Sequence, residues 1–429
     1  MLETIVQLLK ESGVHAWELN EIRTEGWEFY FIRHALDQNR AKSVDHYTIR
    51  VYQLIDGGKA MGSASAKLAP TATEDEARRL IADLAYRATL VKNRPYTLNP
   101  VTEAHRVPAE NKTADLAAIS RDFIGVMRDL PETEAEDINS YEIFVSSNTR
   151  RFLNSEGIDV TESYPSGMIE VVVNARRDGH EIELYRNYES GTCDAEGLRR
   201  DLLRTMQYGK DRLRAVPTPK LGRANVIFSG SDAVSIYEFF AARLSAQMVY
   251  MRMSDWELGK PIAEEMRGDR VTLRTVRQLD NSSENHSFDE EGAPIRDLVL
   301  MKEGVPQSYF GNRMFACYLG LENAFNPGNL VAEGGTRSED ELKDGPYLEA
   351  VEFSDFQVDE MTGDIFGELR LAYWHDGEKT IPVTGGSISG SMFDFVADME
   401  MSKDSVQYNN FRIPSLTMLK NVTVTGVEE

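Results

Sequence analysis

Hydrophobic residues at the amino terminus recur at helical spacing. Leu2, Ile5, Val6 and Leu9 share one face of a predicted helix that ends near Gly13. Strand-like patterns follow it, at residues 15–22, 27–36, 45–55 and, after the turn Asp-Gly-Gly-Lys at 56–59, at residues 60–68. This order predicts an antiparallel hairpin or meander.

A second group of helices and strands repeats the first. Thr73 and Glu76 have the spacing of a capping box, and apolar residues then keep helical periodicity to Val91. Another amphipathic helix is predicted from Leu116 to Met127. Strands are predicted at 141–147, 150–163, 168–176 and 180–190, and a basic helix at 195–215. The order helix, strands, helix therefore occurs twice, which hints at an old duplication.

The segment Val-Pro-Thr-Pro-Lys-Leu-Gly at 216–222 is typical of a domain linker. We therefore predict domains at residues 1–220 and 221–429. The second begins with a strand and a helix and then becomes mostly strand and loop, including a predicted turn at Gly385–Ser391. The predicted fold class is α+β, with two domains: an amino-terminal antiparallel sheet with helices, and a largely β domain containing one buried helix.

That helix, residues 235–244, is apolar nearly all round and should be buried. Glu238 lies in the middle of it, and a buried carboxylate is costly unless it is paired or has a task. Arg243 or another cation could pair with it.

Composition narrows the classes of function. The chain has 429 residues and a formal net charge of −23, which disfavours direct binding to nucleic acid or to an anionic membrane. Its cysteines, Cys193 and Cys317, form no C-x-x-C pair and suit a reducing compartment. The amino terminus has no signal-peptide pattern, and no apolar run approaches the ~18 residues of a membrane span. We expect a cytoplasmic protein.

Candidate chemistry is sparse. None of the seven histidines has another histidine three, four or five residues away, so no helical two-histidine metal site is predicted. Asn154, Ser155 and Gly157 predict a hairpin turn. Asp289, Glu290 and Glu291 could act as acid and base in a metal-independent hydrolase, but a solvated turn is the simpler interpretation.

Several segments together resemble the TldD/PmbA family, whose members are also named modulators of DNA gyrase. They occur in the family's order at residues 150–163, 286–305, 362–392 and 414–426. They contain the run Asn-Ser-x-Gly, an acidic run before Gly-x-Pro, the Thr-Gly-Asp segment with its downstream Pro-Val, and the carboxy-terminal Val-Thr-Val-Thr-Gly.

The resemblance implies a degenerate metallopeptidase site. TldD-type subunits carry His-Glu-x-x-x-His on a helix and a later cysteine, which bind zinc, and the glutamate is the general base. Here Tyr237, Glu238 and Ala242 occupy the motif positions, and no cysteine follows Cys317. We therefore assign no catalytic, cofactor-binding or metal-ligating residue. A zinc motif with this spacing needs a π-type bulge, and we predict that the bulge persists in this helix.

By resemblance, the chain is a non-catalytic subunit, of TldE or PmbA type, in a cytoplasmic zinc-dependent peptidase complex that processes peptides. Its expected partners are a TldD-like zinc subunit and a peptide or unfolded protein, and alone it would form a homodimer. The alternative is a metal-independent hydrolase, or a peptide-binding module that acts without a TldD-like partner.

Overall fold

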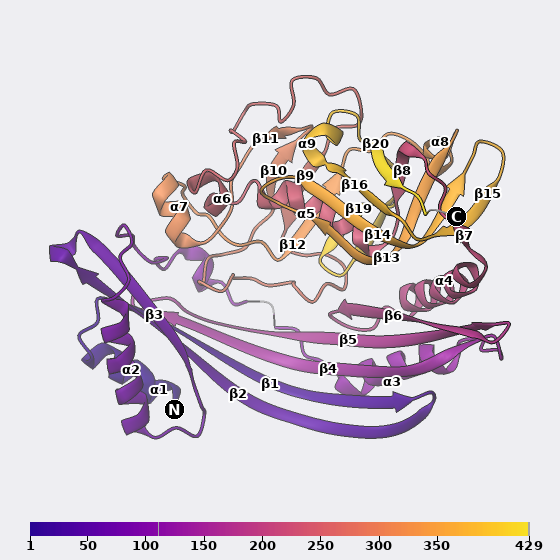
Figure 1. Ribbon diagram of the computed structural model, residues 1–429. Coiled ribbons are helices and arrows are strands. Elements are labelled where there is room, and N and C mark those ends of the chain that lie inside the picture. Colours follow the sequence, from indigo (N-terminus) through magenta and orange to yellow (C-terminus); the bar gives the residue numbers. More distant parts are fainter. Residues whose placement is uncertain (110, 428–429) are drawn as a thin grey trace.

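Six long strands form a curved antiparallel sheet in the first half of the chain (Figure 1). The computed structural model describes residues 1–109 and 111–427. In spatial order the strands are β3 (Ala60–Leu68), β2 (Ala35–Ile55), β1 (Ala16–Ile32), β4 (Glu136–Asn154), β5 (Asp159–Arg177) and β6 (His180–Ser190). The order is symmetrical about the β1–β4 pair, as the repeated helix–strands–helix pattern leads one to expect.

Four α-helices cover this sheet in two pairs: α1 (Leu2–Glu11), α2 (Glu74–Ala88), α3 (Leu116–Arg128) and α4 (Ala195–Arg214). The first two pack on β1, β2 and β3, and the last two on β4 and β5. The 3-10 turns are η1 (Asp56–Gly58) and η2 (Glu103–Arg106). The predicted capping box is confirmed, because the Thr73 side chain accepts from the Glu76 N–H and the Glu76 carboxylate accepts from the Thr73 N–H.

The hairpin of β1 and β2 differs from the prediction. Each is one long strand, and the turn lies at Arg33, whose φ is 54°, inside a segment predicted to be extended. The first eleven residues of β2 are mostly exposed on both faces. Their side chains therefore show no alternation of apolar and polar residues, which is the signal that strand prediction needs.

Two sheets make up most of the second half. The eight-stranded sheet contains, in spatial order, β13 (Tyr347–Val358), β8 (Gly222–Phe228), β20 (Thr417–Thr425), β16 (Ser387–Ser391), β14 (Asp364–His375), β15 (Thr380–Thr384) and β7 (Val216–Pro217), with β17 (Glu400–Met401) paired to β20. The six-stranded sheet contains β11 (Val305–Pro306), β10 (Leu298–Lys302), β9 (Thr272–Val276), β12 (Asn329–Glu333), β19 (Phe411–Pro414) and β18 (Ser405–Tyr408).

Short helices complete this half: η3 (Ser231–Ala233), α5 (Val234–Ala242), α6 (Ala246–Tyr250), α7 (Arg313–Leu319), α8 (Glu339–Leu342) and α9 (Met392–Phe395). The largest core cluster joins residues of both sheets and of α5, which lies inside this half in Figure 1. The two-domain α+β fold with a buried helix in a mainly β domain is confirmed.

Two loop predictions need correction. The expected linker at 216–222 begins with β7, which pairs with β15, and the Thr218 N–H donates to the Thr384 carbonyl, so the segment is docked on the eight-stranded sheet. In the expected turn at 385–391, only Gly385 and Gly386 turn, with φ of 77° and 76°, and the rest is β16. The domain boundary at residue 220 stays a prediction. In the described part of the chain, no helix is both long and apolar enough to cross a membrane.

Candidate functional site

The helix α5 holds Tyr237, Glu238 and Ala242, which the resemblance places at the motif positions, inside the second domain. Tyr237 is fully buried, and its hydroxyl lies 2.7 Å from the Thr417 hydroxyl at the start of β20. Burial raises the pKa of Tyr237 well above its ordinary range, so the phenol keeps its proton. Ala242 is half-buried at the last position of the helix.

Glu238 is half-buried on the same helix. Burial raises its pKa, Glu360 raises it further, and a hydrogen bond with Ser235 opposes both. Among the described residues, no cation forms an ion pair with Glu238. The expected partner, Arg243, instead pairs with Asp255 at 2.6 Å.

Contacts with aromatic rings account for the position of the Arg243 side chain. Its guanidinium carbon lies 4.7 Å from the Phe393 ring centroid and 5.2 Å from that of Trp256. A guanidinium over ring faces gains cation–π attraction where it is buried. Arg243, one of the cations that could have paired with Glu238, therefore pairs elsewhere.

The helix is a regular α-helix from Val234 to Ala242, so the predicted π-type bulge is wrong. Side chains five residues apart on such a helix point about 140° away from each other. Tyr237 points to β20, and the side chain of Ala242 points elsewhere.

The acidic run at 289–291 is not a solvated turn. Asp289 is buried, and its carboxylate accepts the backbone N–H groups of Glu291, Ala293 and Asn326. Burial raises the pKa of Asp289 to about 7 despite these bonds. Glu291 accepts the Arg313 N–H, and Glu290 is exposed. Asp289 and Glu291 hold a loop in place, and the two oxygens of Asp289 are already occupied by the main chain.

The turn after β4 is confirmed. The Asn154 side-chain oxygen accepts the N–H groups of Glu156 and Ile158, each at 3.0 Å, and Gly157 has a φ of 93°. The Ser155 hydroxyl accepts the Trp17 N–H, so it too is structural.

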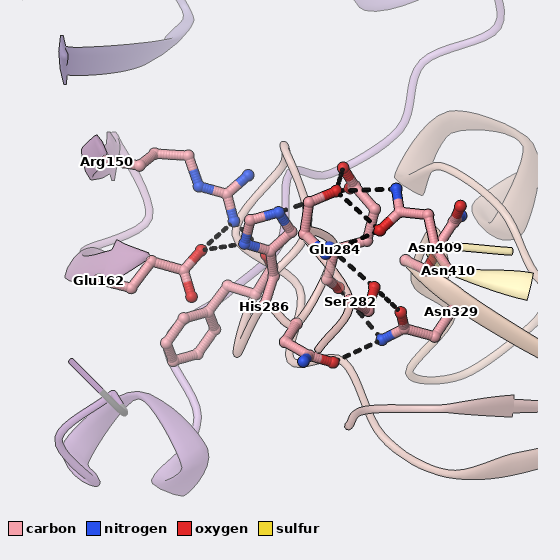
Figure 2. A network of polar contacts seen from close by, with 12 residues as sticks. Arg150, Glu162, Ser282, Glu284, His286, Asn329, Asn409 and Asn410 are labelled. Atoms are coloured by element: carbon pink, nitrogen blue, oxygen red, sulfur yellow. Dashed lines mark hydrogen bonds and ion pairs between the residues drawn. The ribbon is translucent and has the colours of Figure 1, made fainter. Parts of the chain in front are cut away.

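A polar network joins the two halves of the chain next to the loop that contains Asp289 (Figure 2). Arg150 on β4 pairs with Glu162 on β5 at 2.5 Å. His286 lies with Nδ1 3.4 Å from Glu162 and Nε2 3.5 Å from Glu284. Burial alone would lower the pKa of His286, but the two carboxylates outweigh it and raise the pKa. The network anchors the loop of the second domain to the sheet of the first.

Beside this network, a cavity of about 870 Å³ lies between the halves. One wall is the end of β6 with the start of α4, residues 187–201, and the other is formed by residues 280–285 and 407–410. Patterns of apolar and polar residues do not indicate it, because its walls come from segments that are far apart in the sequence.

Comparison with known proteins assigns the second half of the chain to a family domain. Residues 221–426 match the model of the PmbA/TldA metallopeptidase C-terminal domain. This match supports membership of the TldD/PmbA family. A curated relative, the uncharacterised protein MJ0231 of Methanocaldococcus jannaschii, is 24% identical over 281 residues, which are 61% of this chain and 62% of that protein.

Crystal structures of similar fold cover nearly the whole chain. TldE of Thermococcus kodakarensis has a TM-score of 0.77 and 16% identity over 99% of this chain and 100% of that one. A proposed modulator of a DNA gyrase (TM0727) from Thermotoga maritima has a TM-score of 0.77 and 16% identity over 99% of each chain. At this identity, both matches establish the fold.

The zinc that the TldD/PmbA resemblance implies does not fit the residues of α5. The Tyr237 hydroxyl is protonated and bonded to Thr417, and Ala242 has no atom that could bind a metal. In the described part of the chain, no group of three or more His, Cys, Asp or Glu side chains is arranged to hold a metal ion. Tyr237, which the resemblance places at the first histidine, thus lies in the packed core.

Proposed function

We propose that this chain is a non-catalytic subunit of a TldD/PmbA-type peptidase complex in the cytoplasm. One observation carries the proposal: Tyr237 and Ala242 stand at the two histidine positions, and the buried Tyr237 hydroxyl is committed to Thr417. A subunit built this way cannot supply two imidazole ligands for a zinc-bound hydroxide. Its role is to assemble with a zinc-bearing TldD-like subunit and to hold the peptide or unfolded substrate.

Glu238 has no catalytic part in this proposal. Burial favours its protonated form, and the like charge of Glu360 acts in the same direction. A general base needs a water or hydroxyl that it can activate, and neither Tyr237 nor Ala242 offers an imidazole to hold a metal-bound water beside it. In the absence of the TldD-like subunit, the chain forms a homodimer and cleaves nothing.

The gyrase name implies no direct DNA contact. A net charge of −23 repels phosphate backbones, so an effect on gyrase would pass through a peptide substrate.

The test mixes the purified chain with a purified TldD-like zinc subunit and follows cleavage of an unstructured peptide, with and without a chelator. We expect a stable complex whose peptidase activity disappears with the chelator. Glu238→Gln in this chain should leave the rate nearly unchanged, whereas the matching Glu→Gln in the zinc subunit should cost ~10²–10⁴-fold, the usual loss when a general base is removed.

Two results would overturn the proposal. Chelator-resistant cleavage by this chain alone, abolished by Glu238→Gln, would make it a metal-independent enzyme. Failure to associate with any TldD-like subunit would leave the module that acts without such a partner as the better interpretation.

A further inference from the structure

The cavity between the two halves is bordered by the open edges of two sheets. β6 is the last strand of the first sheet, and β18 is the last strand of the six-stranded sheet. Asn187–Ser190 at the end of β6 and Gln407–Tyr408 at the end of β18 line the same cavity of about 870 Å³. An open strand edge presents unpaired N–H and C=O groups to whatever lies beside it.

The direction of these groups on β6 follows from two hydrogen bonds. The Tyr185 carbonyl accepts from the Arg186 guanidinium at 2.8 Å. The Gly191 N–H donates to the Asn281 carbonyl at 2.7 Å. Both groups therefore point away from β5. Because backbone polar groups alternate in direction along a strand and β5 and β6 pair without a bulge, those of Asn187 and Glu189 point the same way, into the cavity. Within the described residues, neither has a backbone hydrogen bond on that side.

The second domain already forms hydrogen bonds with this edge just after the end of β6, at Thr192. The Asn281 side-chain oxygen accepts the Thr192 N–H at 2.8 Å, and its amide donates to the Thr192 carbonyl at 2.6 Å. These are the two bonds that a residue of an added strand would make. Asn281 thus closes one end of the cavity with strand-like pairing and leaves Asn187 and Glu189 open.

We propose that the cavity binds an extended peptide segment, which adds to the edge of β6 as a further strand. The open stretch from Asn187 to Ser190 is about 13 Å long at the usual rise of a strand, enough for about four paired peptide residues. β18 forms the opposite wall. The choice of a peptide rests on the proposed function, but the binding itself requires no zinc subunit.

The side chains of the cavity define which peptides fit. Strand addition uses main-chain bonds for affinity, so sequence preference comes from the walls alone. Carboxylates outnumber cations among the lining residues: Glu189, Asp194, Asp201 and Asp280 against Lys112 and Arg200. The site therefore favours neutral or basic unfolded segments over acidic ones.

The wall opposite β6 is held rigidly enough to form a site. Figure 2 shows Ser282, Asn329 and Asn409 in the polar network that continues from His286. The Ser282 hydroxyl donates to Asn329 at 2.5 Å, and the Asn409 side chain bonds Ser283. Residues whose rotamers are locked by such bonds give a preformed site.

The test measures binding of a short fluorescein-labelled peptide of threonine, serine and lysine to the full chain alone, by fluorescence anisotropy. A second peptide of the same sequence carries N-methyl groups on alternate amides, in both possible registers. N-methylation removes the main-chain donors and keeps the side chains. We expect the unmodified peptide to bind and at least one methylated register to bind about tenfold more weakly, as the loss of one or two hydrogen bonds implies.

Two variants of one residue test the protein side. Glu189→Pro removes the outward N–H and is tolerated at a sheet edge, because that N–H has no partner in β5. Glu189→Ala keeps the N–H and removes only the carboxylate. We expect Glu189→Pro to weaken binding about tenfold relative to Glu189→Ala, with both variants melting as the parent does.

Equal affinity of the methylated and unmodified peptides, equal affinity of the two variants, or no binding of any peptide would each overturn the inference. If Glu189→Pro fails to fold, the methylated peptides decide alone. Since no zinc subunit is present, failure here leaves the complex with a TldD-like subunit untouched, and failure of that complex leaves this binding result standing.

Discussion

Glu18 on β1 is a buried carboxylate whose removal should stabilise the protein above neutral pH. It is 7% exposed, accepts the Tyr52 hydroxyl at 2.7 Å, and has Arg50 at 3.7 Å. Burial, which is the largest cause, and the charge of Glu291, which is the second, raise the pKa of Glu18 from its ordinary 4.5 to about 7. The folded protein therefore holds a proton that the unfolded chain releases at lower pH.

The sign and the size of the effect follow from linkage. Between the unfolded and folded pKa values the native state binds more protons, so the free energy of unfolding falls as pH rises. The difference between 4.5 and about 7, at about 1.4 kcal/mol for each pKa unit, gives a cost of about 3 kcal/mol once Glu18 is ionised in the fold. Glu18→Gln is neutral at every pH and still accepts from Tyr52, so it avoids this cost.

The assay is urea denaturation of both proteins, followed by tryptophan fluorescence, at about pH 5 and about pH 8. We expect Glu18→Gln to be more stable than the parent by up to about 3 kcal/mol at the higher pH and by less than about 1 kcal/mol at the lower. Glu21→Gln on the same strand is the control. Glu21 is also buried, but it pairs with Arg23 at 2.8 Å, so its removal should stabilise at neither pH. An equal gain at both pH values, or no gain at the higher one, would refute the reasoning.

Three further predictions concern packing and metal binding. Arg150→Ala should destabilise the protein by about 3 kcal/mol, because it removes the guanidinium that pairs with buried Glu162 and donates to the Phe288 carbonyl, and leaves His286 as the remaining partner of that carboxylate; urea denaturation checks this, and a loss below about 1 kcal/mol would contradict it. Restoring both histidines with Tyr237→His and Ala242→His should produce no tight zinc site, because a regular α5 points them about 140° apart, and elemental analysis showing about one bound zinc per chain would be the contrary result. Gly62→Ala should lower the melting temperature clearly, since its Cβ would lie 1.9 Å from the Ala88 carbonyl oxygen and push β3 away from α2; an unchanged melting curve would show that the backbone yields.

Local chemistry accounts for the parts of the fold that the sequence predicted well. The capping box at Thr73 and the turn at Asn154 depend on residues two to four positions apart, so their hydrogen bonds can be inferred from spacing alone. The apolar surround of Glu238 predicted a buried helix for the same reason. The exposed half of β2 carries no such signal, and there the prediction was wrong.

For the candidate site, too, the sequence predicts what depends on the residues themselves and does not predict what depends on their neighbours in space. The sequence determined which residues the family resemblance places at the motif positions, and neither Tyr237 nor Ala242 carries an imidazole in any conformation. The position of Arg243 beside Phe393 and the bond of Asp289 to the Asn326 N–H depend on neighbours distant in the chain. A side chain's pKa and pairing depend on what surrounds it in space, and a pattern along one segment does not contain that information.

The cavity between β6 and β18 is the clearest case of what only the tertiary structure decided. The residues of β6 were predicted to form a strand, those of β18 were not, and nothing in the sequence shows that both strands end their sheets or that the two edges lie on one cavity. Period-two alternation reports which face of a strand is buried, not which strand lies beside it. Neighbours within a sheet are chosen by the packing of the whole chain, so the open edges, and the groups they present, exist only once both domains are folded and docked.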